Sequence, residues 1–514
     1  MHRKGYVLLE SNVNDNEEEE DQEEFIHFKT PGAERRKKRL FKYVVAFLAA
    51  LLLLFLVYEM SGGSTADGPE IQLDVGRVRG KTLTLNDGFQ MDVFYGLPFA
   101  EPPTGERRFE KPEPKKPWTG VFEATELKPL CFPIIGDPND ALFTEDCLHM
   151  NVYRPHKINS LLPIMFIVHG APTRRELRAG TRKRKETGRK FVAKGMIVVA
   201  IQYRLAVLGF ASTGDDELKG NFGYWDQAEA LRFVHRNALA FGGDLDRITM
   251  FGCSAGGSSV GVLSICPHTR HMVHQAIMMS GSPFAAWTTS DKTVQKTRQL
   301  VEQLGLRDGE SVKARLEASD DGRNLRRAAE NRESSSSSTH SFRNAKFDDP
   351  QAVRREILEF YLKPKEGEVV NNVFYLQRYT QIFSDLQFTV AIARDISERK
   401  ARGWPIHAYM TTYVNPGAVG ETCPIKKSFH GADQRYLILG EVDVLRFEKN
   451  ADDFAMESLL VDTRPESLEF AALQPKPEMR AHLFADRLAF WSKLAADHGF
   501  DLVRGLPSEQ KNKP

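Results

Sequence analysis

A strand-to-helix turn around a serine constrains the fold of this chain more than any other feature. Residues 250–257 read Met-Phe-Gly-Cys-Ser-Ala-Gly-Gly, a G-x-S-x-G pattern between an apolar run and a helix start of small residues. In such a turn the Ser254 hydroxyl projects outward, and the backbone N–H of Ala255 can meet a developing oxyanion. Glycine is expected at 252 and 256, because side chains there would clash as strand and helix close on the bend. The pattern predicts a nucleophile at Ser254, and a plain glycine-rich turn is the alternative.

Short, continuously apolar runs around this turn predict a parallel sheet. Residues 162–168, 196–203 and 247–251 read as buried strands, with helical stretches such as 226–237 between them. This alternation predicts an α/β fold, in which a central, mostly parallel sheet carries helices on both faces. Catalytic groups in such sheets gather at the carboxyl ends of the strands, which is where His169, Gly170 and Ser254 fall.

Further motifs along the chain resemble, in order and spacing, the type-B carboxylesterase and cholinesterase family. They are Phe-Tyr-Gly-Leu-Pro-Phe-Ala-Glu-Pro-Pro at 94–103, Glu-Asp-Cys-Leu-His-Met-Asn-Val-Tyr at 145–153, Gln-Tyr-Arg-Leu at 202–205, Gly-Asn-Phe-Gly-Tyr-Trp-Asp-Gln at 220–227 and Ser-Gly-Ser at 280–282. The resemblance is close from 70 to 300 and looser from 350 to 450. It implies an α/β-hydrolase fold and a serine carboxylic-ester hydrolase without a cofactor. The same fold also includes neurotactin-like adhesion proteins that have lost catalysis.

The resemblance also implies a catalytic histidine and a catalytic acid. His430, in Phe-His-Gly-Ala-Asp at 429–433, matches the family's catalytic His-Gly. The acid is harder to place, because no apolar strand leads to a carboxylate in the irregular segment 307–346, where a family strand is expected. By position Glu333 is the candidate, and Asp321, which precedes a glycine, is its rival. The alternative is that both are solvated charges in a disordered segment and neither is the catalytic acid. A triad without its acid typically loses about four orders of magnitude in rate.

The expected oxyanion hole departs from the family pattern. His169-Gly170-Ala171-Pro172 stands where the family has His-Gly-Gly-Gly. Ala171 and Ala255 can donate backbone N–H groups, but Pro172 has none. Losing one such donor typically costs about 100- to 1,000-fold in turnover. Two functions therefore remain open: an ester hydrolase with impaired turnover, acting on a small ester, or an inactive domain that binds a protein partner. The basic run 173–190 is a solvated loop or a docking surface for an anionic partner.

The amino-terminal residues predict a membrane anchor. An acidic tract at 17–24 and a basic cluster at 35–39 precede an uncharged apolar run at 43–58, which is near the lower limit for a membrane-spanning helix. The sequence thus predicts a disordered cytoplasmic tail at 1–40, a transmembrane helix at 41–60, a linker at 61–70 and the esterase-like domain at 71–505. The long polar stretch before the run disfavours a cleaved signal peptide. The basic cluster favours a single-pass type II orientation with the large domain extracellular or lumenal.

The cysteines and the charge balance narrow the possible compartment, partners and substrates. Cys131 and Cys147 flank fifteen residues, and the family resemblance implies a disulfide between them, which needs an oxidising compartment. The 70 basic and 69 acidic residues nearly cancel, so no nucleic-acid partner is expected. The histidines and cysteines show no metal-ligand spacing, so no metal is expected. The loop between the two cysteines lacks a tryptophan that could hold a quaternary ammonium, which disfavours choline esters.

Overall fold

The computed structural model divides the chain into two compact units, Met1–Asp67 and Gly68–Pro514. It describes residues 42, 43, 45, 47, 48, 68–85, 87–132, 140–170, 190–289, 292–305, 310–318, 347, 349–411, 425, 458–461, 479–480 and 484–508. The described residues of the first unit are helical and exposed. Within these described ranges, no helix has the length and apolar character needed to cross a membrane. Most of the predicted span 41–60 lies outside them.

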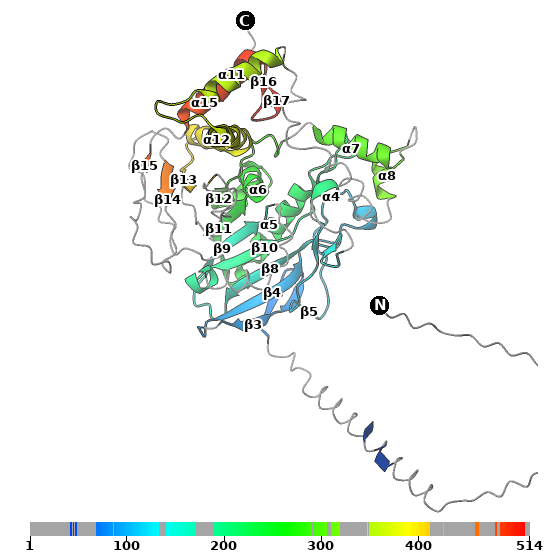
Figure 1. Ribbon diagram of the computed structural model, residues 1–514. Coiled ribbons are helices and arrows are strands. Elements are labelled where there is room, and N and C mark those ends of the chain that lie inside the picture. Colours follow the sequence, from blue (N-terminus) through cyan, green and yellow to red (C-terminus); the bar gives the residue numbers. More distant parts are fainter. Residues whose placement is uncertain are drawn as a thin grey trace, which may run out of the picture. The chain divides into compact units, whose positions relative to one another are not determined.

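The described part of the second unit is built around a mixed seven-stranded sheet, in the order β12-β11-β9-β10-β8-β4-β3 (Figure 1). Its strands are β3 Lys81–Thr84, β4 Gln90–Pro98, β8 His149–Pro155, β9 Leu162–Val168, β10 Ile197–Ile201, β11 Gly243–Cys253 and β12 Gln275–Met279. The four strands β12, β11, β9 and β10 are parallel to one another. The next three, β8, β4 and β3, continue the sheet with antiparallel pairing. The carboxyl ends of the parallel strands therefore meet at one edge.

Shorter sheets and a set of helices accompany the central sheet. The short strands are β1 Glu70–Leu73, β2 Gly76–Arg79 and β5 Val121–Glu123; β6 Leu130–Cys131 and β7 Phe143–Thr144; β13 Ala408–Thr411, β14 Ser458–Val461 and β15 Met479–Arg480; β16 Phe500–Asp501 and β17 Leu506–Pro507. The α-helices are α4 Ala206–Phe210, α5 Phe222–Phe241, α6 Ala255–Ile265, α7 Lys292–Gln303, α8 Val312–Glu317, α11 Pro350–Leu362, α12 Asn372–Ser384, α13 Val390–Ala401 and α15 Ala485–His498. Three short 3-10 helices are η1 Gly105–Arg107, η2 Val192–Lys194 and η3 Arg270–Met272, and η4 Asp385–Thr389 is a π-helix.

The predicted α/β fold is confirmed. Strand β9 has the bounds predicted for it, β10 and β11 occupy the other two apolar runs, and α5 contains the predicted helix. Both faces of β9 are buried, because Phe166 packs in the cluster that includes α5 and α6, while Met165 packs with Val192 of η2 on the other side. Burial on both faces explains why this strand is apolar at every position instead of alternating.

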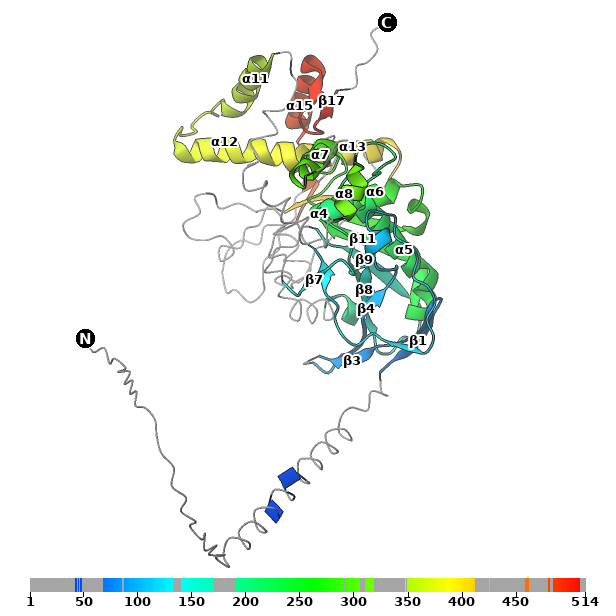
Figure 2. The same ribbon diagram turned by 90° about the vertical axis from the view of Figure 1, so that its right-hand side faces the viewer.

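A second helical layer packs away from the central sheet. Helices α12 and α13 are joined by η4 into one rod, and α11 and α15 pack beside it (Figure 2). A buried polar cluster holds this layer together: the Tyr361 hydroxyl donates to Asp385 at 2.8 Å, Arg487 pairs with the same carboxylate at 3.0 Å, and the Trp491 indole donates to Tyr361 at 2.7 Å. The π-helical turn places Asp385 at the centre of that cluster.

Only part of the irregular segment 307–346 is described. Residues 312–317 form α8, and the Ser311 hydroxyl accepts a hydrogen bond from the backbone N–H of Ala314 as its amino-terminal cap. The remainder, including Asp321 and Glu333, lies outside the described residues.

Candidate active site

Ser254 lies at the junction of β11 and α6, in a backbone conformation that side-chain-bearing residues rarely adopt. Its φ is 59° and its ψ is −124°. Its N–H donates to the carbonyl of Met279 in the neighbouring strand at 2.9 Å, and its carbonyl accepts from the N–H of Ser258 at 3.0 Å. Such a conformation costs about 1–3 kcal/mol and persists only where the surroundings enforce it. It is the sharp strand-to-helix bend expected of an exposed nucleophilic serine.

The glycines around the bend are required by close backbone approach. A Cβ on Gly252 would lie 2.2 Å from the carbonyl oxygen of Gly256, and a Cβ on Gly256 would lie 2.2 Å from the carbonyl oxygen of Val168. Both distances are far below any van der Waals contact, so no side chain fits at either position without moving the backbone. The prediction that glycine is required at 252 and 256 is confirmed, and α6 packs directly against the end of β9.

The end of β9 brings Gly170 to the same bend. A Cβ on Gly170 would lie 2.5 Å from the carbonyl oxygen of Cys253, 3.3 Å from the Cβ of Ser254 and 3.6 Å from the nitrogen of Ala255. Ala255 is the first residue of α6, so its N–H is among those left unpaired by the helix itself and lies at the positive end of the helix dipole. The structure therefore places the nucleophile candidate, one oxyanion donor candidate and Gly170 together.

His169 lies at the same edge of the sheet and packs against Tyr203. Its ring stacks on that of Tyr203 with centroids 4.5 Å apart, and the Tyr203 hydroxyl donates to the His169 carbonyl at 2.7 Å. Nδ1 lies 2.8 Å from the Gly170 carbonyl, which identifies it as the protonated nitrogen. Nε2 is buried and finds no hydrogen-bond partner in the described part of the chain. Burial lowers the pKa of His169, so the ring is neutral at physiological pH.

The remaining predicted site residues fall outside the described residues. His430, Glu333 and its rival Asp321, and Ala171 and Pro172 are among them, as is the basic run up to residue 189. Of the predicted catalytic and oxyanion residues, the structure thus describes and brings together Ser254 and Ala255. Within the described residues, no group of three or more histidine, cysteine or acidic side chains could hold a metal ion.

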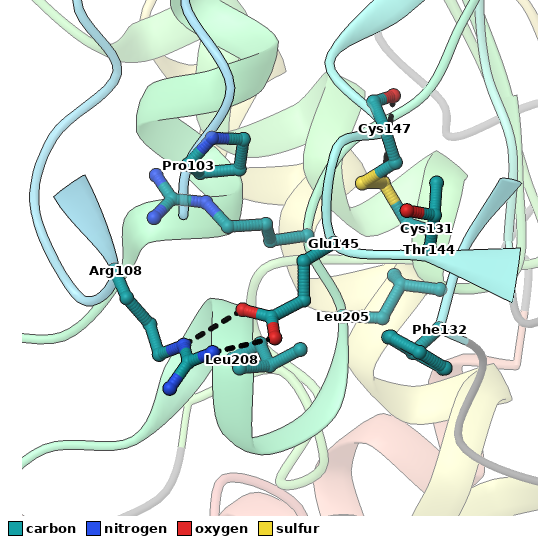
Figure 3. A pocket seen from close by; sticks show the side chains of 10 residues that line it. Pro103, Arg108, Cys131, Phe132, Thr144, Glu145, Cys147, Leu205 and Leu208 are labelled. Carbon is teal, nitrogen blue, oxygen red and sulfur yellow. Dashed lines mark hydrogen bonds and ion pairs between the residues drawn. A yellow bond between two sulfur atoms is a disulfide. The ribbon is translucent and has the colours of Figure 1, made fainter. Parts of the chain in front are cut away.

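The structure contains the disulfide that the family resemblance implies. Cys131 and Cys147 are joined with a Cα–Cα distance of 5.0 Å. Beside them lies a cavity of about 10 Å³, which is room for about one water molecule (Figure 3). The cavity is therefore too small for an ester substrate.

Two buried ion pairs border this cavity. Arg108 donates from Nε and Nη2 to the two oxygens of Glu145, both at 2.7 Å, as Figure 3 shows. Arg204 donates to the two oxygens of Asp226 at 2.8 and 2.7 Å. Such bidentate pairs fix geometry as well as charge. No role for these four residues is predicted from the sequence. Glu145, Arg204 and Asp226 nevertheless stand inside the motifs that carry the resemblance, and that was the signal that could have pointed to them.

Comparison with known proteins identifies the family. The model of the carboxylesterase family matches residues 67–319. Gut esterase 1 of Caenorhabditis briggsae is 30% identical over 563 aligned positions, which cover 89% of this chain and 97% of that protein. The chain belongs to the carboxylesterase family. Carboxylesterase 1E of Rattus norvegicus is 37% identical over 51% of this chain and 48% of its own length, and pyrethroid hydrolase Ces2a of Mus musculus is 39% identical over 45% and 43%. Family membership confirms the predicted class, an ester hydrolase with an α/β-hydrolase fold.

Proposed function

We propose that this carboxylesterase-family protein cleaves small carboxylic esters through an acyl-enzyme on Ser254. The observation that carries the proposal is the strained bend at Ser254, with Gly170 packed against it and Ala255 beginning the following helix. Strained backbone is kept at a site only where the surrounding structure enforces it, and here Gly170, Gly252 and Gly256 allow the backbone to pack closely around the bend. The name of one relative, gut esterase 1, is consistent with ester hydrolysis.

The proposed reaction follows the chemistry of serine hydrolases. The Ser254 hydroxyl attacks the ester carbonyl while His430 takes its proton and passes it to the departing alcohol, and water then releases the acid by the same route in reverse. The N–H groups of Ala255 and Ala171 stabilise the oxyanion. We assign Glu333 as the acid that orients His430, with Asp321 as its rival; Glu333→Gln and Asp321→Asn, measured side by side, separate the two.

Hydrolysis of p-nitrophenyl butyrate tests the proposal. We expect Ser254→Ala and His430→Ala each to lower kcat by at least about a thousandfold, because serine and base act as a unit. Ser259→Ala, one turn further along α6, is the matched control and keeps wild-type turnover. Equal turnover in Ser254→Ala and the wild type would place the chemistry elsewhere.

Pro172 favours a second candidate function. Because proline has no N–H, the hole lacks the third donor of the family pattern, and turnover then falls by about 100- to 1,000-fold. In that case the domain serves as a neurotactin-like binding module for a protein partner. Pro172→Gly distinguishes the two: a rise in kcat supports a hydrolase limited by its oxyanion hole, and no turnover in either form supports the binding module.

We further propose a single-pass type II arrangement with the esterase domain extracellular or lumenal. The basic cluster before the apolar run supports this orientation, and the disulfide supports an oxidising compartment. Carbonate extraction and protease protection of the full chain test it. Release of the chain by carbonate would contradict the anchor, and digestion of the large domain in intact, right-side-out microsomes would contradict its lumenal position.

A further inference from the structure

A short turn after β12 lies directly behind the nucleophile. A Cβ on Gly281 would lie 2.2 Å from the carbonyl oxygen of Ser254 and 2.6 Å from the nitrogen of Ser258. The residue before it, Ser280, has a φ of 49°, which is also left-handed. The turn 280–282 thus touches the peptide groups that hold the bend, so a shift of this turn moves Ser254.

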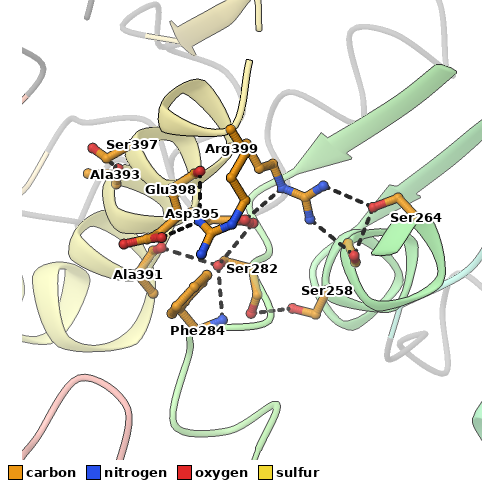
Figure 4. A network of polar contacts seen from close by, with 12 residues as sticks. Ser258, Ser264, Ser282, Phe284, Ala391, Ala393, Asp395, Ser397, Glu398 and Arg399 are labelled. Atoms are coloured by element: carbon orange, nitrogen blue, oxygen red, sulfur yellow. Dashed lines mark hydrogen bonds and ion pairs between the residues drawn. The ribbon is translucent and has the colours of Figure 1, made fainter. Parts of the chain in front are cut away.

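Ser282 connects this turn to two helices. It is fully buried, and its carbonyl accepts from the Ser258 hydroxyl of α6 at 3.1 Å. Its own hydroxyl faces the carbonyl of Ala391 at 3.2 Å and the Oδ2 of Asp395 at 3.3 Å, both on α13. The same oxygen accepts from the N–H of Phe284 at 3.1 Å. Figure 4 shows Ser282 between Asp395 and Ser258.

A buried ion pair on α13 completes the connection. Arg399 donates from Nε to Asp395 at 2.7 Å, and it reaches across to α6, where it donates to the Ser264 hydroxyl at 3.0 Å and to the Gly261 carbonyl at 3.1 Å (Figure 4). The exposed fractions of the Arg399 and Asp395 side chains are 9% and 6%. One helix is therefore bonded both to the turn behind Ser254 and to the helix that begins after it.

We propose that Asp395 and Arg399 form a positioning pair for Ser254: they hold the turn 280–282 and helix α6 in the one arrangement that keeps the strained bend in place. Neither residue touches substrate; both act through Ser282 and α6. The inference rests on the proposed function of Ser254. Hydrogen-bonded side chains of this kind hold catalytic groups to within a fraction of an ångström, and a misplacement of about 1 Å can cost about 100-fold in rate.

The test replaces the whole pair, since removing one partner leaves a buried, unpaired charge that can unfold the protein, whereas apolar replacement of both is often tolerated. In Asp395→Leu/Arg399→Met we expect kcat for p-nitrophenyl butyrate, and the rate of Ser254 labelling by a fluorophosphonate, to fall about 10- to 100-fold. KM should change less than about twofold, because the substrate contacts are elsewhere.

The ion pair between Arg394 of the same helix and Asp501 of β16 is the matched control. Arg394 pairs with Asp501, and this pair has no hydrogen bond to the turn 280–282 or to α6 among the described residues. In Arg394→Met/Asp501→Asn we expect kcat and labelling as in the wild type; asparagine keeps an acceptor for the backbone N–H groups of Val503 and Arg504.

Ser282→Ala is a smaller variant that tests the same link if the double variant does not fold. It removes the hydroxyl between the turn and α13, and we expect kcat to fall about tenfold with KM unchanged. A folded double variant, or Ser282→Ala, with wild-type kcat and labelling would overturn the positioning role. A wild type without turnover or label would instead overturn the proposed function, so the two failures are distinguishable.

Discussion

Replacing Ser254 by glycine should stabilise the protein while it abolishes activity. The strain at this residue arises because its Cβ is held at a φ of 59° and a ψ of −124°. Glycine has no Cβ and adopts such angles freely, whereas alanine keeps the Cβ and therefore the strain. Ser254→Ala is thus the reference variant, since both replacements remove the hydroxyl and differ only in the Cβ.

The size of the effect follows from two opposing contributions. Relief of the strained backbone should contribute about 1–3 kcal/mol. The greater freedom of glycine in the unfolded chain costs about 0.4–1 kcal/mol. We therefore expect the free energy of unfolding of Ser254→Gly to exceed that of Ser254→Ala, by up to about 2.6 kcal/mol.

Equilibrium urea denaturation of the two variants, followed by tryptophan fluorescence, measures this difference. Ser259 provides the control, because it lies in α6 with ordinary helical geometry. There glycine should be less stable than alanine by about 1 kcal/mol, the opposite sign. If glycine is also the less stable replacement at 254, the bend is not strained and the reasoning about the nucleophile's geometry fails.

Three further predictions concern the framework of the site. Gly256→Ala should lower stability by about 1–3 kcal/mol and lower kcat, because its Cβ would meet the Val168 carbonyl at 2.2 Å; unchanged denaturation and kinetics would contradict this. Cys131→Ala/Cys147→Ala should lose about 3 kcal/mol in urea denaturation, as expected for a bridge across a loop of this length, and no loss would mean that the bridge does not constrain the unfolded chain. Burial lowers the pKa of His149 below its unfolded value near 6.5. The unfolded chain then takes up the proton first, so this residue's contribution is lost as pH falls below about 6.5, by up to about 1.4 kcal/mol per pH unit. Urea denaturation at pH 7.5 and 5.5 should show a smaller loss in His149→Phe than in the wild type, and equal losses would refute the assignment.

The parallel half of the sheet could be predicted from the sequence because burial on both faces leaves an unmistakable pattern. Strand β9 is apolar at every position, and its observed bounds are the predicted ones. Strand β10 ends two residues before the predicted end, because Tyr203 leaves the strand and its hydroxyl binds the carbonyl of His169. The antiparallel strands β3, β4 and β8 were not predicted, since their polar and apolar residues mix and their pairing joins distant segments.

The bend at Ser254 could be predicted from the sequence in detail, whereas the distant residues that hold it in place could not. The glycines at 252 and 256 follow from local sterics, which a five-residue pattern carries. The pair Asp395–Arg399 lies more than a hundred residues further along the chain, and its four-residue spacing is that of an ordinary exposed helical ion pair. Only the packing of α13 against α6 makes it a buried link to the site.

The central claim, that Ser254 is an active nucleophile, is tested most directly by the intact mass of the purified full chain after reaction with a fluorophosphonate. We predict one adduct, mapped by peptide sequencing to Ser254 and absent from Ser254→Ala. A well-folded wild type that gains no mass, or an adduct that persists in Ser254→Ala, would contradict the account.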